Sequence, residues 1–411
     1  MCTYRSIAPI LMVGLLAHVA VLAGTGADIH LAARKGDLHK IRSLLAEGAE
    51  VNARDSEGNT PLHITLSVGK PRIAEVLIEN GAEVNARNMS GITPLHLAVT
   101  ANTPNIAKLL LDKGADINAA SGNGRTPLHV AVDNGKTEMV LLLLQRGAIA
   151  NLKYSSGDTL LHETVRMARQ EIAKALIERR LDINAKGQHG FTPLHLAAAN
   201  NDVAMARILV ESGAELETRS NYAITPLYVA VLRETMDVAE FLIHRGADIN
   251  ARDNDGRSPF VRALVEGKLK NAGFLASRGA SIDAKTADGR ALPFWAVTAG
   301  RRDELALLLA HGAKVNARDN RGNTLMHQAV VADRLDIARF LLENRADVNA
   351  ANQLGETPLH AAAAWGRFDH AKLLLNKGAS TRVQNLQGKT AADIAETLGR
   401  HELAKLMRTG K

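Results

Sequence analysis

Hydrophobic and polar residues follow a pattern that repeats every 33 residues along most of the chain. The tetrad Thr-Pro-Leu-His marks this period, because it occupies residues 60–63, 93–96, 126–129, 192–195 and 357–360. Degenerate tetrads fill the remaining positions of the same register without any insertion or deletion, as at 159–162 and 258–261. A fixed period of this length indicates a repeat protein in which each repeat packs on its sequence neighbours.

One period predicts two helices and a loop. In the repeat that begins at Thr93, the threonine stands where a helix N-cap belongs, and a proline follows at the first helical position. The apolar residues 97–99 continue this first helix, residues 104–112 supply a second helix, and Gly114 ends it. Residues 115–124 then form the loop that leads to the next repeat. Neither helix can bury its apolar face alone, so each repeat depends on its neighbours for stability.

The tetrad and its period resemble the ankyrin-repeat family from about Asp28 to the last residue. The resemblance implies an all-α solenoid of helix-turn-helix pairs with β-hairpin loops, in about 12 repeats including two caps. The repeats, numbered 1 to 12 below, begin near residues 27, 60, 93, 126, 159, 192, 225, 258, 291, 324, 357 and 390. A glycine stands five residues before the His position in ten of the eleven turns, and Ala223 is the exception. Glycine at this place suits a turn that needs positive φ.

Composition agrees with one elongated array over residues 24–411. The 411 residues are 46% hydrophobic but only 3% aromatic, so small aliphatic side chains do most of the packing. The formal net charge is +7, yet lysines and arginines never form a run longer than two. Such dispersed charge is typical of a solvated surface and does not favour nucleic acid as a partner.

The N-terminus departs from the repeat. Residues 1–23 hold one basic side chain and a nearly continuous apolar stretch that ends in small residues, which is typical of a signal peptide. The apolar stretch is shorter than the roughly 20 residues of a membrane span, which favours cleavage near Ala23 over an N-terminal anchor. We therefore expect an exported bacterial protein in the periplasm or secreted. The alternative is tethering to the inner membrane by an uncleaved leader, which would be the only membrane contact.

The sequence offers no catalytic, cofactor or metal site. Eight histidines fall on the repeat register, but neighbouring stacked helices lie roughly 8 to 10 Å apart, too far for successive imidazoles to share a zinc ion. By resemblance to the family, each of these histidines hydrogen-bonds the turn and the motif threonine. The one cysteine, Cys2, lies in the leader, so a cleaved chain has no thiol nucleophile. We expect a monomer that is not an enzyme and needs no cofactor.

Partner binding is expected at the positions that the repeat leaves free. In the ankyrin-repeat family these are the hairpin tips and the exposed end of the first helix, and aromatic side chains are common interface anchors. Repeats 5 to 7, which hold all the tyrosines outside the leader, are the candidate groove. The predicted partner-binding residues are Tyr154, Arg166, Met167, Gln188, His189, Phe191, Asn221, Tyr222, Ile224, Leu232, Arg233 and Trp365.

Two functions therefore remain open. The first is a non-enzymatic scaffold that binds one or more partner proteins on its concave face after export. The second is a cationic surface that binds nucleic acid or anionic envelope polymers through the net charge of +7.

Overall fold

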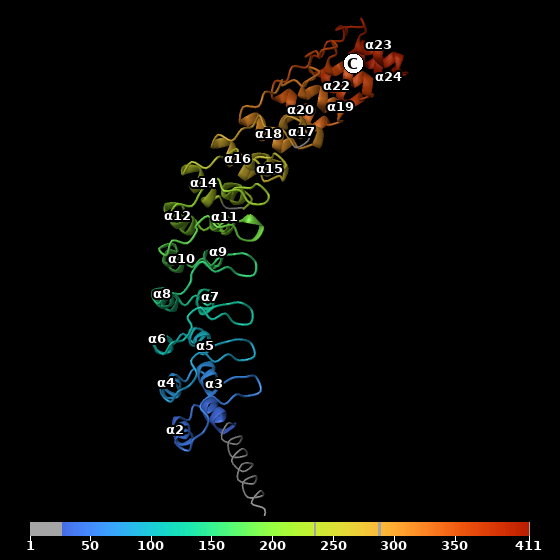
Figure 1. Ribbon diagram of the computed structural model, residues 1–411. Helices are drawn as coiled ribbons and strands as arrows, with labels where there is room; N and C mark the ends of the chain where they lie inside the picture. The colour runs from blue at the N-terminus through green and yellow to red at the C-terminus, as the bar shows by residue number, and fades with distance from the viewer. Residues whose placement is uncertain (1–26, 234–235, 287–288, 411) are drawn as a thin grey trace, which may run out of the picture. The chain divides into compact units, whose positions relative to one another are not determined.

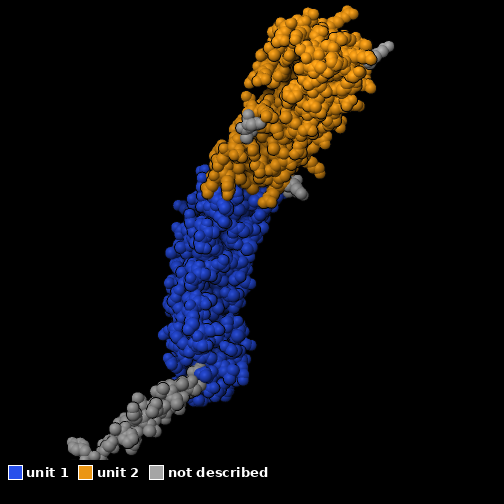
Figure 2. All heavy atoms as spheres, turned by 90° about the vertical axis from the view of Figure 1, so that its right-hand side faces the viewer, with its two compact units in different colours: residues 1–218 blue, residues 219–411 orange. Residues whose placement is uncertain are grey.

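The computed structural model describes residues 27–233, 236–286 and 289–410, and within them it is helical with no named strand. The leader predicted over residues 1–23 lies outside the described residues. The chain divides into two compact units, an N-terminal unit (Met1–Thr218) and a C-terminal unit (Arg219–Lys411), which Figure 2 colours separately. Among the residues described, no helix combines the length and the apolar character needed to cross a membrane.

The N-terminal unit begins with helical residues 27–35 and continues as a series of short helix pairs. The elements are α2 (Leu38–Ala46), α3 (Pro61–Ser67), α4 (Pro71–Glu79), α5 (Pro94–Thr100), α6 (Pro104–Asp112), α7 (Pro127–Asp133), α8 (Thr137–Gln145), α9 (Leu160–Arg166), α10 (Gln170–Ile177), the short 3-10 helix η1 (Gln188–Gly190), α11 (Pro193–Asn200) and α12 (Val203–Glu211). The first helices of the repeats pack side by side in one row, which consists of α3, α5, α7, α9 and α11. The second helices form another row, which consists of α2, α4, α6, α8, α10 and α12 (Figure 1). The helices begin and end where the motif predicts, as α5 and α6 show.

The C-terminal unit repeats the same design. Its helices are α13 (Pro226–Val231), α14 (Asp237–His244), α15 (Pro259–Val265), α16 (Leu269–Ser277), α17 (Leu292–Ala299), α18 (Arg302–Ala310), α19 (Leu325–Val331), α20 (Leu335–Glu343), α21 (Pro358–Trp365), α22 (Phe368–Asn376), α23 (Ala391–Thr397) and α24 (His401–Thr409). The first helices α17, α19, α21 and α23 pack in sequence, and so do the second helices α16 to α24. The predicted all-α repeat fold is therefore confirmed. That residues 24–411 form a single array stays a prediction.

Leucine and alanine side chains from both helices make up much of the core, together with isoleucine, valine and a few larger residues. In repeat 11, Leu359, Ala362 and Ala363 of the first helix are fully buried, and so is Leu374 of the second. Burying a leucine contributes roughly 1.5 to 3 kcal/mol relative to leaving it exposed, so the stack gains stability with each added interface. Nothing in this core converges on a reactive group.

Three kinds of hydrogen bond join consecutive repeats. The His63 ring donates through Nε2 to a backbone carbonyl 29 residues later at 3.0 Å. The Asn52 side chain accepts from a backbone N–H 31 residues later at 2.8 Å, and the Arg54 guanidinium donates to a carbonyl 33 residues later at 2.7 Å. Corresponding bonds in the C-terminal unit start from His327, Asn316 and Arg318. Where these bonds form within one unit, consecutive repeats are hydrogen-bonded as well as packed.

The motif histidines have the structural role that the family resemblance implies. The backbone N–H of Thr60 donates to Nδ1 of His63 at 3.2 Å, and the hydroxyl of Thr60 lies 2.9 Å from the same nitrogen. Because Nδ1 accepts and Nε2 donates, the ring is neutral with its proton on Nε2. In the part of the chain that is described, no group of three or more His, Cys, Asp or Glu could hold a metal ion.

The tips have the predicted backbone conformation but little β structure. Gly58 and its equivalents through Gly388 have positive φ, and Ala223 takes the same place with a φ of 57°. The described tips contain three isolated bridges, at Lys153 and Thr159, Lys285 and Ala291, and Arg318 and Thr324. The tip backbone is bonded mostly through local turns and side chains such as Asp319, so the loops are hairpin-like turns without extended strands.

Candidate functional site

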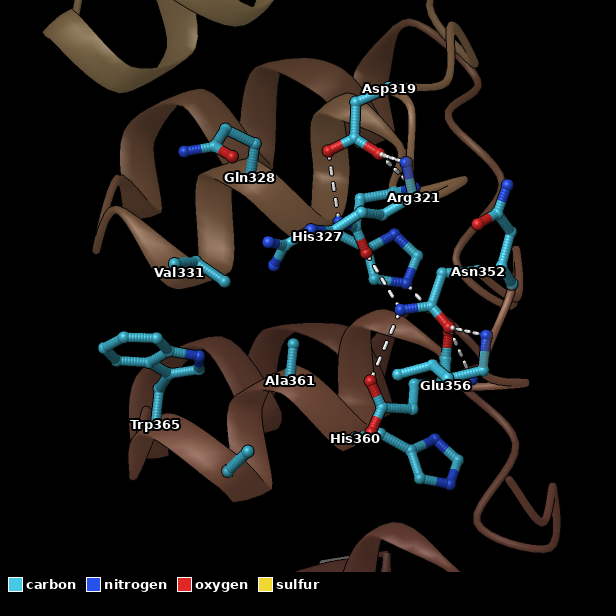
Figure 3. A pocket seen from close by; sticks show the side chains of 14 residues that line it. Asp319, Arg321, His327, Gln328, Val331, Asn352, Glu356, His360, Ala361 and Trp365 are labelled. Carbon is cyan, nitrogen blue, oxygen red and sulfur yellow. Dashed lines mark hydrogen bonds between the residues drawn. The ribbon is translucent and has the colours of Figure 1, made fainter. Parts of the chain in front are cut away.

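A groove with a volume of about 620 Å³ lies between α19 and α21 in the C-terminal unit. We call it the α19–α21 groove; its walls are these two helices and the tip residues 319–323 and 352–356. Its size falls within the roughly 300 to 1,000 Å³ of small-ligand pockets. Figure 3 shows that side chains of two chemical kinds occupy its two ends.

One end of the α19–α21 groove is apolar. Val331 ends α19, and Ala361 and Ala364 lie on α21 where larger side chains would fill the space. Trp365 follows at the end of α21 and leaves 55% of its surface exposed. Leu354, 59% exposed, also lines the groove but belongs to the tip that carries Asn352 and Glu356. These groups give a flat aromatic wall with open apolar surface beside it.

The other end is polar and carries two carboxylates. Asn352 donates through Nδ2 to the side-chain oxygen of Asn323 at 2.9 Å and to Oε2 of Glu356 at 3.3 Å (Figure 3). Asp319 accepts from the backbone N–H groups of Arg321 and Asn323, both at 2.8 Å. These bonds hold the two tips together and fix where the carboxylates lie.

Tyr154 lies at a tip and is hydrogen-bonded within the array. Its hydroxyl donates to a carboxylate oxygen of Asp133 at 2.7 Å, and its ring packs edge-on against His129 with 4.7 Å between centroids. Burial and then the Asp133 carboxylate raise the pKa of Tyr154 above its usual value. Asp133 also forms an ion pair with Arg125 at 2.7 Å. Tyr154 is therefore half-buried and engaged within the array, which removes its hydroxyl from the partner surface.

Arg166 is also held by its own repeat. Its guanidinium donates to Asp158 at 2.7 Å and pairs with Glu163. The Asp158 carboxylate is buried and also accepts from the backbone N–H of Gln188 at 2.8 Å. Although burial alone raises the pKa of Asp158, these two donors hold it below its ordinary value. The neighbouring Met167 keeps 47% of its surface exposed and fits the predicted role better.

The tip of repeat 6 forms a small aromatic cluster. The Phe191 ring stacks on the motif histidine His195 with 5.2 Å between centroids and 12° between planes. His189, in η1 with a φ of 57°, meets the edge of Phe191 at 6.4 Å. Gln188 and His189 are exposed and Phe191 is half-buried. These three residues therefore do lie together at one tip, as predicted.

The tip of repeat 7 is in the C-terminal unit. Tyr222, Ile224 and Leu232 line a hollow of about 300 Å³ together with acidic residues such as Asp255. Tyr222 is 51% exposed. Asn221 and Arg233 are also exposed but do not line this hollow.

The predicted binding groove that runs through repeats 5 to 7 is not tested by the structure and stays a prediction. Tyr154 and Phe191 belong to the N-terminal unit and Tyr222 to the C-terminal unit, and each unit stands by itself. Trp365 lies in the α19–α21 groove, whose other contributors Val331 and Glu356 were not predicted. A signal was present in the register, because Glu356 directly precedes a motif threonine and Trp365 follows the same threonine by eight residues.

Burial lowers the pKa of several motif histidines, which favours their neutral form. Burial lowers the pKa of His327, and the hydrogen bond from its ring to the Glu356 carbonyl opposes this only in part. Burial has the same effect on the pKa of His63, His96, His162 and His360. These rings are thus structural donors and acceptors within the stack, and they carry no charge to a ligand near neutral pH.

Comparison with known proteins agrees with this geometry. The sequence matches the family described as "Ankyrin repeats (3 copies)" at residues 29–121, 118–187, 149–220 and 182–253. It matches "Ankyrin repeats (many copies)" at residues 326–375. The first family alone covers more than half of the chain.

Two curated plant proteins share a short similar segment. "Acyl-CoA-binding domain-containing protein 4" of Oryza sativa subsp. japonica is 49% identical over 49 residues, or 12% of this chain and 15% of that protein. "Acyl-CoA-binding domain-containing protein 1" of Arabidopsis thaliana is 45% identical over 47 residues, or 11% of this chain and 14% of that protein. The chain thus spans a small fraction of these relatives, and the similarity reaches little more than one repeat.

Ankyrin repeats are generally non-enzymatic modules for protein–protein interaction. The matched residues coincide with the helix pairs and with the bonded motif histidines described above. The chain therefore belongs to the ankyrin-repeat family.

Proposed function

We propose that this protein is a scaffold that binds partner proteins with its hairpin tips and first-helix ends and catalyses no reaction. The observation that carries the proposal is the exposure of large apolar side chains at positions that stacking does not use. They are Met89, Met167, Tyr222, Leu354, Trp365, Leu386 and Leu398, each about half exposed or more. Exposed apolar and aromatic groups are typical anchors of interfaces.

Partner capture with a triple variant tests the proposal. The chain and a variant with Met89→Ala, Tyr222→Ala and Trp365→Ala are each used to capture proteins from an envelope extract, and the captured proteins are identified by mass spectrometry. We expect the variant to lose specific partners while its thermal unfolding stays unchanged, because the three side chains are at least half exposed. Tyr154→Ala is a poor test, since Tyr154 is bonded to Asp133 within the array.

The salt dependence of binding distinguishes a protein-binding scaffold from a cationic surface that binds anionic polymers. If binding depends on net charge, it falls steeply between about 50 and 200 mM salt and is the same for the chain and the triple variant. That outcome would refute the scaffold and support binding of nucleic acid or anionic polymers. Binding that tolerates salt but needs the apolar side chains supports the scaffold.

We also propose that the protein is exported and acts as a monomer, with residues 1–23 as its leader. The apolar stretch of the leader supports export, and the thiol-free sequence after Cys2 suits an oxidising compartment. N-terminal sequencing of the mature protein and fractionation of the producing cells test this. An intact N-terminus in the membrane fraction would favour tethering instead, and sedimentation analysis tests the monomer.

A further inference from the structure

The α19–α21 groove is too narrow to hold a partner helix. Its walls are neighbouring stacked helices, whose axes lie roughly 8 to 10 Å apart, whereas a helix with its side chains is about 10 to 12 Å across. Its volume of about 620 Å³ suits a few side chains of an extended segment.

Backbone N–H groups of the tips at the groove are already hydrogen-bonded and cannot donate to an added strand. The N–H of Gln353 donates to the Arg321 carbonyl at 3.1 Å, and the N–H of Leu354 donates to the Asn352 side chain at 2.9 Å. The N–H of Arg321 is bonded to Asp319. An incoming segment is therefore recognised through its side chains.

The side chains that line the groove favour a partner with one apolar and one basic residue. At the apolar end, Trp365 stands half exposed beside Val331 and the small Ala361 and Ala364. At the polar end, Glu356 forms no ion pair with any described residue, and its one side-chain hydrogen bond comes from Asn352 at 3.3 Å. Two carboxylates and one guanidinium line the groove, which leaves one negative charge in excess.

Other repeats show that the fold does not require these two residues. The position of Trp365 is occupied by Ala101, Asn134 and Ala332, and the position of Glu356 by Asn59, Arg125 and Asn323. The equivalent groove between α5 and α7 has a similar volume of about 590 Å³. In the α5–α7 groove, Arg125 occupies the position of Glu356 and is paired with Asp133. The tryptophan and the unpaired carboxylate are therefore particular to the α19–α21 groove.

We propose that the α19–α21 groove binds an extended segment of a partner protein, with a large apolar side chain packed beside Trp365 and a lysine or arginine paired with Glu356. The inference rests on the proposed scaffold function and names the chemistry of its partner. The aromatic surface at one end would bind the apolar side chain, and the carboxylate at the other end would bind the basic one. A segment that carries both residues would therefore bind more tightly than a segment with only one of them.

Selection of displayed random peptides on the full chain tests the inference. We expect enriched peptides to share a basic residue a short distance from a large apolar one. Their affinity is then measured by fluorescence anisotropy with synthetic labelled copies. Enrichment of acidic peptides, or no enrichment, would overturn the proposal.

Two variants test the proposed contacts of Trp365 and Glu356 separately. Each replaces the residue by the one that another repeat has at the same position. Trp365→Ala, which places there the residue found at position 332, should weaken the selected peptides about tenfold or more, as truncation of a buried anchor does. Glu356→Asn, which copies position 323, should weaken them about threefold and abolish the preference for the basic residue. Leu141→Ala, at an exposed position on α8 of the N-terminal unit to which no binding role is given, is the matched control and should change nothing. Equal affinities for the chain and Trp365→Ala would contradict the site.

The outcomes distinguish this inference from the proposed function. If captured partners survive Trp365→Ala but are lost with Tyr222→Ala, the scaffold stands and this groove is not its site. If neither change affects capture, both proposals fail. Circular dichroism of each variant confirms that the helices are retained.

Discussion

Replacing His370 by isoleucine should stabilise the C-terminal unit. His370 is 2% exposed on α22, and its Nε2 has no hydrogen-bond partner among the described residues. Its other nitrogen lies 3.5 Å from a carboxylate oxygen of Asp333, which is itself more than half exposed. The same register position holds Ile73, Ile106 and Ile337 in other repeats, so the site can accept an isoleucine.

The expected gain follows from these contacts. An unpaired buried polar group costs about 1 to 3 kcal/mol, while an ion pair to an exposed carboxylate contributes less than about 1 kcal/mol. His370→Ile should therefore raise the free energy of unfolding by about 1 to 2 kcal/mol. Both tryptophans of the chain, Trp295 and Trp365, belong to the C-terminal unit, so urea unfolding followed by their fluorescence reports this unit alone.

The gain should also grow as pH falls. Burial lowers the pKa of His370, which the carboxylate of Asp333 opposes only in part. Below about pH 6.5, the unfolded chain takes up a proton that folded His370 resists, so the wild-type chain loses stability on acidification. The variant lacks this contribution. A urea midpoint that does not rise at about pH 8, or a difference that shrinks at about pH 5.5, would refute the reasoning.

Three further changes test other contacts. Tyr154→Phe removes the bond to Asp133 and should lower the stability of the N-terminal unit by about 1 to 2 kcal/mol in thermal unfolding followed by circular dichroism; an unchanged midpoint would contradict the structural role. Gly187→Ala would place a Cβ 2.1 Å from Asp158 and should cost about 2 kcal/mol or more in the same assay, and a neutral effect would show that the contact is wrong. Gly366→Ala, at a φ of 69°, should cost about 1 kcal/mol by tryptophan fluorescence, whereas a gain in stability would argue against a left-handed backbone there.

The sequence predicted the repeat fold because its signals are local. A motif threonine followed by proline starts many of the first helices, and a glycine with positive φ turns every described tip but the one at Ala223. At Ala223, where the glycine is missing, the structure still has positive φ, which the glycine pattern alone did not predict. Such signals act within a few residues, so they can be read along the chain.

The candidate site was harder to predict because its contacts join tips and helices through side chains whose partners the repeat pattern does not specify. The repeat register shows that Tyr154 and Arg166 lie near tips and helix ends, but not that Asp133 and Asp158 bind them. In the same way, the groove beside Trp365 depends on small alanines within its own helix and on side chains from two tips. The residue to which a long side chain bonds depends on which other side chains the folded solenoid places near it.

The bonds between repeats connect residues 29, 31 or 33 positions apart, as those of His63, Asn52 and Arg54 do. Duplication or loss of one whole 33-residue segment would leave every such donor facing an acceptor of the same kind. Insertion of a single residue into a tip would instead misalign several bonds at once. Lineages that carry this gene should therefore differ in length by complete segments, and shorter changes should be confined to the ends.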